Sequence, residues 1–173
     1  MNNGQKKLIN QRGFTLIEML IAIAIAGLII SSIAAVIMQT VTVSAADSKR
    51  MEAVKQVENA LHWIDRDAQM TSRNSLNTNN PTLPNFPLKL SWINFDGEQH
   101  AVTYSIVSGV LQRSESVNGG TASVSSIAQH IVAASSNYTF DGRVLIVNLT
   151  STTVGFGSAS ESRTLYVIPR VGQ

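Results

Sequence analysis

The sequence predicts an α+β fold, in which a long amino-terminal helix, membrane-spanning in its first half, packs on a carboxyl-terminal antiparallel β-sheet. Three observations support this prediction. An apolar run from Phe14 to Met38 carries only one formal charge, at Glu18. A helical pattern then continues to about Thr71, and no proline lies between Phe14 and Ser72. The rest of the chain consists of short alternating segments separated by turn signals, which is typical of antiparallel strands.

The apolar run is long enough to cross a bilayer. As a helix, residues 14–38 extend ~37 Å at ~1.5 Å per residue, and the hydrocarbon core of a bilayer is ~30 Å thick. A removed secretory signal is the alternative. Such a signal ends in a small-residue cleavage site, and the nearest one here, Val43-Ser44-Ala45-Ala46, does not follow soon after the run. The sequence therefore favours a retained membrane helix.

Basic residues and chain length together predict the orientation. Three basic residues lie before the run (Lys6, Lys7 and Arg12) and two lie soon after it (Lys49 and Arg50). This balance favours a cytoplasmic amino terminus. The carboxyl-terminal part is long and polar and has no second apolar run of spanning length. We expect a single-pass membrane protein with its bulk outside the cytoplasm.

Glu18 is the unusual residue of the apolar run. A carboxylate at the centre of a bilayer costs ~2.5–3.5 kcal/mol even on mild insertion scales. Two interpretations follow. Close to the membrane interface the charge is simply tolerated, whereas deeper in the bilayer it marks a group that recognises a partner.

Beyond the membrane, residues 39–73 are expected to continue the helix as an amphipathic segment. Apolar residues recur there at steps of three and four, the spacing of one helical face. These residues are Met51, Val54, Val57, Leu61, Ile64 and Ala68. This face is the predicted cover for the sheet.

A linker loop is predicted over 74–87, because this stretch is rich in Asn, Ser, Thr and Pro. A β-rich outer domain is expected over 88–173. Its predicted strands are 88–92, 100–107, 110–113, 138–140, 143–149 and 163–168, and residues 126–134 fit either a strand or a short helix. Turn signals stand at Asp96-Gly97, Ser108-Gly109, Asn118-Gly119-Gly120 and Asp141-Gly142.

Composition argues against several functions. Three of the 13 basic residues precede residue 14, which leaves 10 basic against 11 acidic residues, so direct nucleic-acid binding is not expected. The chain has no cysteine, which excludes a disulfide and thiol catalysis. The three histidines are scattered and lack metal-ligand spacing. We therefore expect no catalytic residues, no metal and no cofactor, and hence no enzyme.

Four residues near the end of the helix or in the first strand were weighed as site residues. Asp65 and Asp67 point about 200° apart on a helix, which suits a solvated or subunit-facing polar surface better than a shared metal or proton. Trp63 and Trp92 are expected to pack in the core or between helix and sheet rather than to form a ligand platform.

The amino-terminal segment resembles that of type IV prepilins and type II secretion pseudopilins. The resemblance rests on the basic leader, on Arg12-Gly13-Phe14-Thr15-Leu16-Ile17-Glu18 and on the apolar helix that follows. It covers about the first quarter of the chain. Within this family, a helix-breaking proline often follows a glycine such as Gly27, but Ala35 stands in its place here.

The resemblance implies a maturation pathway. Residues 1–13 are a leader that a prepilin peptidase removes by cutting after Gly13, and the new terminus at Phe14 is N-methylated. The helix over 14–38 then serves first as a membrane anchor and afterwards as an assembly helix. Within a filament, Glu18 pairs with the Phe14 amine of a neighbouring subunit and so sets the register. The implied partners are the peptidase, other pilin or pseudopilin subunits, an inner-membrane assembly platform and, before assembly, membrane lipid.

A finer resemblance points to J-type minor pseudopilins or minor pilins. It rests on the helix end 61–67, on 102–106 with 109–113, and on the last strand 164–169. The expected function is thus a minor structural subunit of a type IV pilus or a type II secretion pseudopilus. Secretion, retractable and DNA-uptake systems all use such subunits. The alternative is a signal-anchored outer domain with an independent binding or hydrolytic role.

Overall fold

The computed structural model describes residues 15–79 and 85–171. The chain forms two compact units, one ending at Thr42 and the other beginning at Val43. Helix α1 (Leu16–Met70) starts in the first unit and runs into the second. Its observed end agrees with the predicted helix, which was expected to reach about Thr71.

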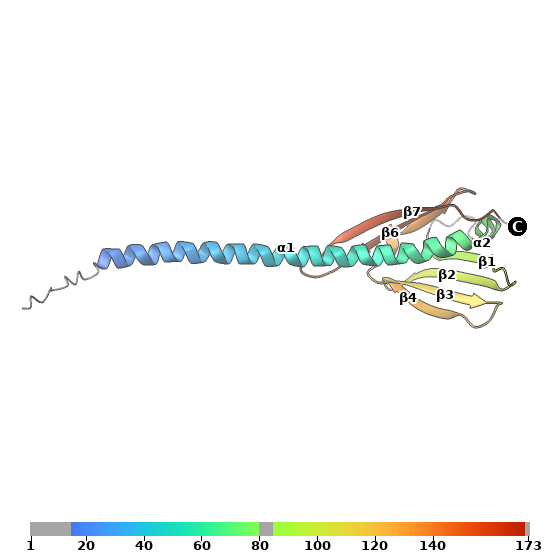
Figure 1. Cartoon of the computed structure of the whole chain (residues 1–173), viewed down its shortest axis with the longest axis horizontal. Helices are drawn as coiled ribbons and strands as arrows, with labels where there is room; N and C mark the ends of the chain where they lie inside the picture. Colours follow the sequence, from blue (N-terminus) through green and yellow to red (C-terminus); the bar gives the residue numbers. More distant parts are fainter. Residues whose placement is uncertain (1–14, 80–84, 172–173) are drawn as a thin grey trace, which may run out of the picture. The chain divides into compact units, whose positions relative to one another are not determined.

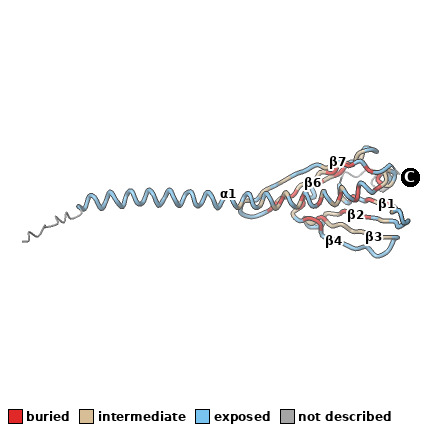
Figure 2. The backbone as a smooth tube through the Cα atoms, in the orientation of Figure 1, coloured by how far each residue is buried: buried red, intermediate tan, exposed pale blue. Residues whose placement is uncertain are grey.

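In the first unit, α1 has exposed side chains throughout, as the pale-blue tube in Figure 2 shows. Its residues are mostly Ala, Ile, Leu and Val, and it contains one glycine, Gly27. By length and composition, α1 is the helix among the described residues that could cross a membrane. The predicted apolar segment is therefore a continuous helix whose apolar surface the rest of the described chain does not cover.

The second unit contains the remainder of α1, a short helix and two antiparallel sheets (Figure 1). The first sheet has four strands in sequence order: β1 (Leu88–Ile93), β2 (Gln99–Val107), β3 (Val110–Val117) and β4 (Ser123–Ala128). The second sheet has three, also in sequence order: β5 (Asn137–Phe140), β6 (Leu145–Thr152) and β7 (Ser160–Val167). The α+β prediction is confirmed, but the strands form two sheets rather than one.

The segment between β4 and β5 explains the division. Strand β4 ends at Ala128, and Ile131 then makes an isolated bridge to Ser151 of β6. A 3₁₀ turn follows at Ala133–Ser135. The segment 126–134, which fitted a strand or a helix, thus ends one strand and crosses to the other sheet.

Turn residues set the register of the first sheet. Val107 pairs with Val110, and the two residues between them, Ser108 and Gly109, have φ angles of 50° and 78°. Positive φ at both central positions is the requirement of a type I′ hairpin turn, whose twist matches that of the strands. This turn places Val102 and Tyr104 of β2 on the buried face.

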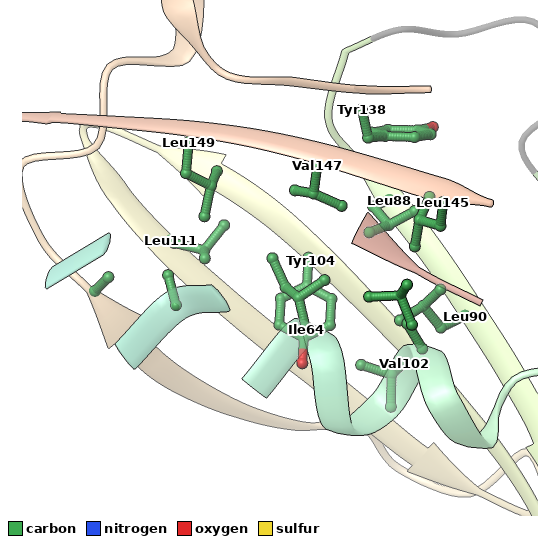
Figure 3. Close-up of a cluster of buried hydrophobic side chains, with 14 of the residues drawn as sticks. Ile64, Leu88, Leu90, Val102, Tyr104, Leu111, Tyr138, Leu145, Val147 and Leu149 are labelled. Carbon is green, nitrogen blue, oxygen red and sulfur yellow. The ribbon is translucent and has the colours of Figure 1, made fainter. Parts of the chain in front are cut away.

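The core lies between α1 and the inner faces of the two sheets. Figure 3 shows Ile64 of α1 close to Tyr104 and Val102 of β2, with Val147 and Leu149 of β6 in the same cluster. All five side chains are at most 1 % exposed. Each residue of this size stabilises the fold by ~1.5–3 kcal/mol on burial.

The buried face of α1 differs from the predicted one. The structure buries Ala53, Val57, Ala60, Ile64, Asp67 and Ala68. Met51 is 59 % exposed, and Val54 and Leu61 are only partly buried. Three of the buried residues are alanines, whose small side chains allow the sheets to approach the helix backbone closely. The prediction is therefore right for Val57, Ile64 and Ala68 and wrong for Met51, and it missed the small residues Ala53 and Ala60.

The predicted linker contains a short helix, α2 (Arg73–Asn79). Ser72 begins it as an amino-terminal cap, because its Oγ accepts a hydrogen bond of 3.3 Å from the backbone N–H of Ser75. Leu76 is completely buried in the main core cluster. Burial of this leucine offsets the weak helix propensity of the surrounding Asn and Thr residues, which had favoured a loop.

The β6–β7 loop, defined as residues 153–159, is fixed against α1. Its ends are joined by a hydrogen bond of 2.9 Å from the Thr153 N–H to the Ala159 carbonyl. Gly157 lies so close to the helix that an added Cβ would stand 2.8 Å from the backbone nitrogen of Ala46. Its φ of +74° also disfavours any residue with a side chain.

Replacing Gly157 with alanine is expected to destabilise the second unit by more than ~1 kcal/mol, because either the loop or the helix backbone must move. Gly119→Ala is the matched control: its φ is +69°, but nothing lies within 4 Å of its added Cβ. Urea unfolding of both full-length variants in detergent measures the difference. Equal losses in the two variants would show that backbone strain, not the helix contact, explains the Gly157 effect.

Candidate functional site

The exposed apolar surface of α1 is the first candidate site. Large apolar side chains from Leu16 to Val43 are at least half exposed. Exposed apolar area on this scale is unfavourable in water and marks a membrane or protein contact. The surface needs an apolar environment, which a bilayer or a bundle of similar helices provides.

Polar side chains in this part of α1 are satisfied by the helix itself. The hydroxyls of Ser31 and Ser32 both donate to the carbonyl of Leu28, at 2.9 and 2.8 Å. Thr40 donates to the carbonyl of Val36 at 2.9 Å. Such bonds replace the water partners that hydroxyl groups lose in hydrocarbon. The helix surface therefore presents little unsatisfied polarity to its surroundings.

Glu18 caps the start of α1. Its Oε2 accepts hydrogen bonds from the Thr15 backbone N–H at 3.0 Å and from the Thr15 hydroxyl at 2.9 Å. In return, the Thr15 hydroxyl oxygen accepts from the Glu18 N–H at 3.3 Å. This reciprocal arrangement is a capping box, which satisfies backbone donors that the first helical turn leaves free. Thr-x-x-Glu is its local signal in the sequence, and the prediction made for Glu18 did not include it.

The other predicted site residues, Gly13 and Phe14, lie outside the described residues. So do the basic residues of the predicted leader. Glu18 is thus the one predicted site residue whose surroundings the described part of the chain defines.

A buried polar network in the second unit corrects the prediction for Asp67. This carboxylate was expected on a solvated or subunit-facing surface, but it is 2 % exposed. Arg113 of β3 donates to both of its oxygens, from Nε at 2.7 Å and from Nη2 at 3.2 Å. Tyr104 of β2 donates to Oδ2 at 2.6 Å. The network joins α1 to the first sheet.

The network continues to the surface through Glu115 and His100. Arg113 Nη1 donates to Glu115 Oε2 at 2.6 Å, and His100 Nδ1 lies 3.0 Å from Glu115 Oε1. The fold therefore gives His100 a carboxylate partner, which its position in the sequence did not reveal. The His100 ring also stacks on Trp92, with ring centroids 5.2 Å apart.

Both tryptophans pack as predicted, between helix and sheet or in the core. Trp92 is buried, and Trp63 packs against the main core cluster. The guanidinium carbon of Arg113 lies 5.3 Å from the Trp63 ring centroid, and that of Arg66 lies 5.5 Å from it. These are cation–π distances, so Trp63 supports the charged network from the helix side.

The electrostatics of the network favour permanent charge rather than proton transfer. Burial, together with the Asp67 charge, raises the pKa of Tyr104 far above its usual value. Burial alone would lower the pKa of Arg113, but hydrogen bonds to Asp67 and Glu115 outweigh this effect and raise it. Tyr104 therefore remains a neutral donor and Arg113 a cation at any physiological pH. The network is suited to holding elements together.

The surroundings of Glu115 make the free energy of unfolding depend on pH. Its hydrogen bond with Arg113 lowers its pKa below the ordinary value of 4.5. A lowered pKa in the folded state adds stability that is complete above pH ~4.5 and is lost as pH falls through the folded-state value. We expect Glu115→Gln to cost ~1 kcal/mol at pH 7 and progressively less below pH ~4.5. Urea unfolding across pH 3–7 measures this convergence; a pH-independent cost would contradict it.

Metal chemistry finds no support in the described residues. Across 15–79 and 85–171, no group of three or more His, Cys, Asp or Glu side chains is arranged to hold a metal ion.

Comparison with known proteins identifies the amino-terminal segment. Residues 8–37 match the family model of the prokaryotic N-terminal methylation motif. No curated protein and no solved structure matches the chain. The match supports a relationship to type IV pilins and pseudopilins. It implies processing by a prepilin peptidase, anchoring in the inner membrane and assembly with other pilin-type subunits.

Proposed function

We propose that this chain is a minor structural subunit of a type IV pilus or of a type II secretion pseudopilus. The observation that carries the proposal is the coincidence of the methylation motif over 8–37 with a helix whose apolar surface is exposed from Leu16 onward. An anchor alone needs only the apolar surface. A subunit needs both, because the same helix must leave the bilayer and pack among other helices.

Maturation in this proposal follows the motif. Residues 1–13 are the leader, the peptidase cuts after Gly13, and Phe14 becomes the methylated terminus. The amino terminus faces the cytoplasm and the second unit lies outside, where the assembly platform extracts the processed subunit. The finer similarity of 61–67, 102–106 and 109–113 to J-type sequences supports the minor-subunit assignment.

Glu18 has two separable tasks in this proposal. Its carboxylate completes the capping box with Thr15, and its charge pairs with the Phe14 amine of a neighbouring subunit. An ion pair of this kind is much stronger inside a dry helix bundle than in water. A carboxylate has two oxygens, and both bonds to Thr15 use Oε2.

The first test is processing. The chain is co-expressed with a prepilin peptidase, and its intact mass and amino-terminal sequence are measured. A product that begins at N-methylated Phe14 supports the proposal. An uncut chain, obtained while a known substrate is cut in parallel, would instead favour a signal-anchored outer domain.

Substituting Glu18 tests assembly. Glu18→Ala is expected to be cut normally but to enter filaments at least tenfold less than the wild type, because it removes both charge and cap. Glu18→Gln is the matched variant, since its amide oxygen can still accept from Thr15 but carries no charge. Quantitative immunoblotting of sheared filaments measures incorporation. Failure of both variants assigns the role to the charge, whereas normal incorporation of Glu18→Gln would limit Glu18 to capping.

A further inference from the structure

The β6–β7 loop presents two large apolar side chains to its surroundings. Val154 is 72 % exposed and Phe156 is 68 % exposed. The loop that carries them is ordered by its own hydrogen bonds, including one of 3.1 Å from the Ser158 N–H to the Gly155 carbonyl. It is also held against α1, through the close approach of Gly157 to Ala46. An ordered loop, packed against α1, therefore keeps the two side chains exposed.

The composition around the loop favours an apolar partner. No charged residue occurs from Leu145 to Ser160. Neither Val154 nor Phe156 belongs to the core cluster or packs against it. A stretch without charge can enter a medium of low polarity without the large desolvation cost of an ionised group.

The position of the loop on α1 identifies that partner. It contacts the helix at Ala45 and Ala46, and the apolar run ends at Met38. About seven residues separate these points, a rise of ~10 Å in a helix. The headgroup region on each side of a bilayer is ~5–8 Å thick. With residues 14–38 in the hydrocarbon, the loop is thus within reach of the lipid surface.

Charge on the neighbouring helical turn is compatible with lipid phosphates. Arg50 lies one turn after the contact point, while Lys49 pairs with Glu52 at 2.8 Å and Asp47 adds a negative charge. The net charge of this turn is small, so apolar insertion carries most of the interaction. Two side chains are far too few for a specific protein interface, which buries ~800 Å² on each partner.

We infer that the β6–β7 loop is a membrane-surface contact. Before assembly, while the subunit is anchored in the bilayer, Val154 and Phe156 insert among lipid headgroups. The inference rests on the proposed function, because it requires residues 14–38 to span the membrane. Assembly must then withdraw both the helix and this loop from lipid. The loop thereby holds the second unit at the membrane surface before extraction.

A depth measurement by spin labelling tests the inference, because the chain contains no cysteine to interfere. Ser158→Cys places a nitroxide on the exposed loop and keeps both apolar side chains. Phe95→Cys places one at the exposed tip of the β1–β2 hairpin. Its neighbour Asn94 lines a pocket with Met70, which lies ~37 Å along α1 from the loop contact. Ile25→Cys places one in the apolar run. The full-length protein is reconstituted in phosphatidylethanolamine–phosphatidylglycerol vesicles, and label accessibility to oxygen and to a water-soluble nickel chelate is compared.

The label at Ser158 is expected to be at least threefold less accessible to the nickel chelate than the label at Phe95. Adding Val154→Ser and Phe156→Ser to the Ser158 variant should remove this protection. A Ser158 label as accessible as the Phe95 label overturns the inference. Protection that rises with the protein-to-lipid ratio also overturns it, since the partner is then another copy of the chain. An Ile25 label outside the hydrocarbon would instead refute the proposed membrane helix, and the inference with it.

Discussion

An Asp67→Ala variant is expected to lose ~3–5 kcal/mol of the free energy of unfolding, the typical cost of removing one partner of a buried ion pair. The change leaves the Arg113 guanidinium, whose side chain is 11 % exposed, without two of its hydrogen-bond contacts. It also removes the acceptor of the buried Tyr104 hydroxyl. Domains of this size are commonly stable by ~5–15 kcal/mol, so a loss of this size approaches unfolding. Urea unfolding of the full chain in detergent measures it.

Asp65→Ala is the matched control, because it removes the same group two residues away on the same helix. Asp65 is only partly buried, and its loss is expected to stay within ~0.5 kcal/mol. Arg113→Met then completes a double-mutant cycle with Asp67→Ala. We expect the double variant to be less destabilised than the sum of the single ones, since removing both charges leaves neither unpaired. Additive losses would mean that the two residues do not act as a pair.

Local patterns made much of the fold predictable. The extent of α1 follows from the absence of proline between Phe14 and Ser72 and from the helical spacing of its apolar residues. The hairpins follow from turn residues such as Ser108-Gly109, where the required positive φ angles are found. These features depend on neighbours in the sequence, so the sequence alone contains the information.

Features that depend on distant residues could not be predicted in the same way. Asp67 meets Arg113, 46 positions later, only because β3 folds back along α1. Spacing on the helix alone placed Asp67 on a solvated or subunit-facing surface. The buried face of α1 was predicted only in part for a related reason, since the close approach of two sheets also selects small residues such as Ala53 and Ala60. The division into two sheets likewise depends on where the segment after β4 crosses to β6.

The candidate assembly site shows both kinds of feature. The motif is a contiguous stretch and was therefore found directly in the sequence, as the match over 8–37 supports. The capping box of Thr15 and Glu18 was also encoded locally, but a functional interpretation of the carboxylate concealed the simpler structural one. Val154 and Phe156 carry no motif at all. Only the folded contact between their loop and α1 relates them to the membrane.

The second large effect is expected from Gly13→Ala, which should abolish processing and leave the chain as an uncut precursor in the membrane. In the proposed maturation, an added methyl group would stand beside the peptide bond that the peptidase binds and cuts, and alanine would also restrict the backbone. Intact-mass measurement after co-expression with the peptidase distinguishes the precursor from the proposed product, which would lack residues 1–13 and carry one methyl group.

Gly27→Ala is the control for a general effect of replacing glycine in this segment. Nothing lies within 4 Å of the added Cβ, and alanine favours a helix by ~1 kcal/mol over glycine, so this variant should be cut as well as the wild type. If Gly13→Ala loses processing and Gly27→Ala does not, cleavage requires the motif, and filament entry is then expected to require cleavage. A Gly13→Ala chain that is still cut and assembled would separate assembly from the motif, and the exposed helix would then need another explanation.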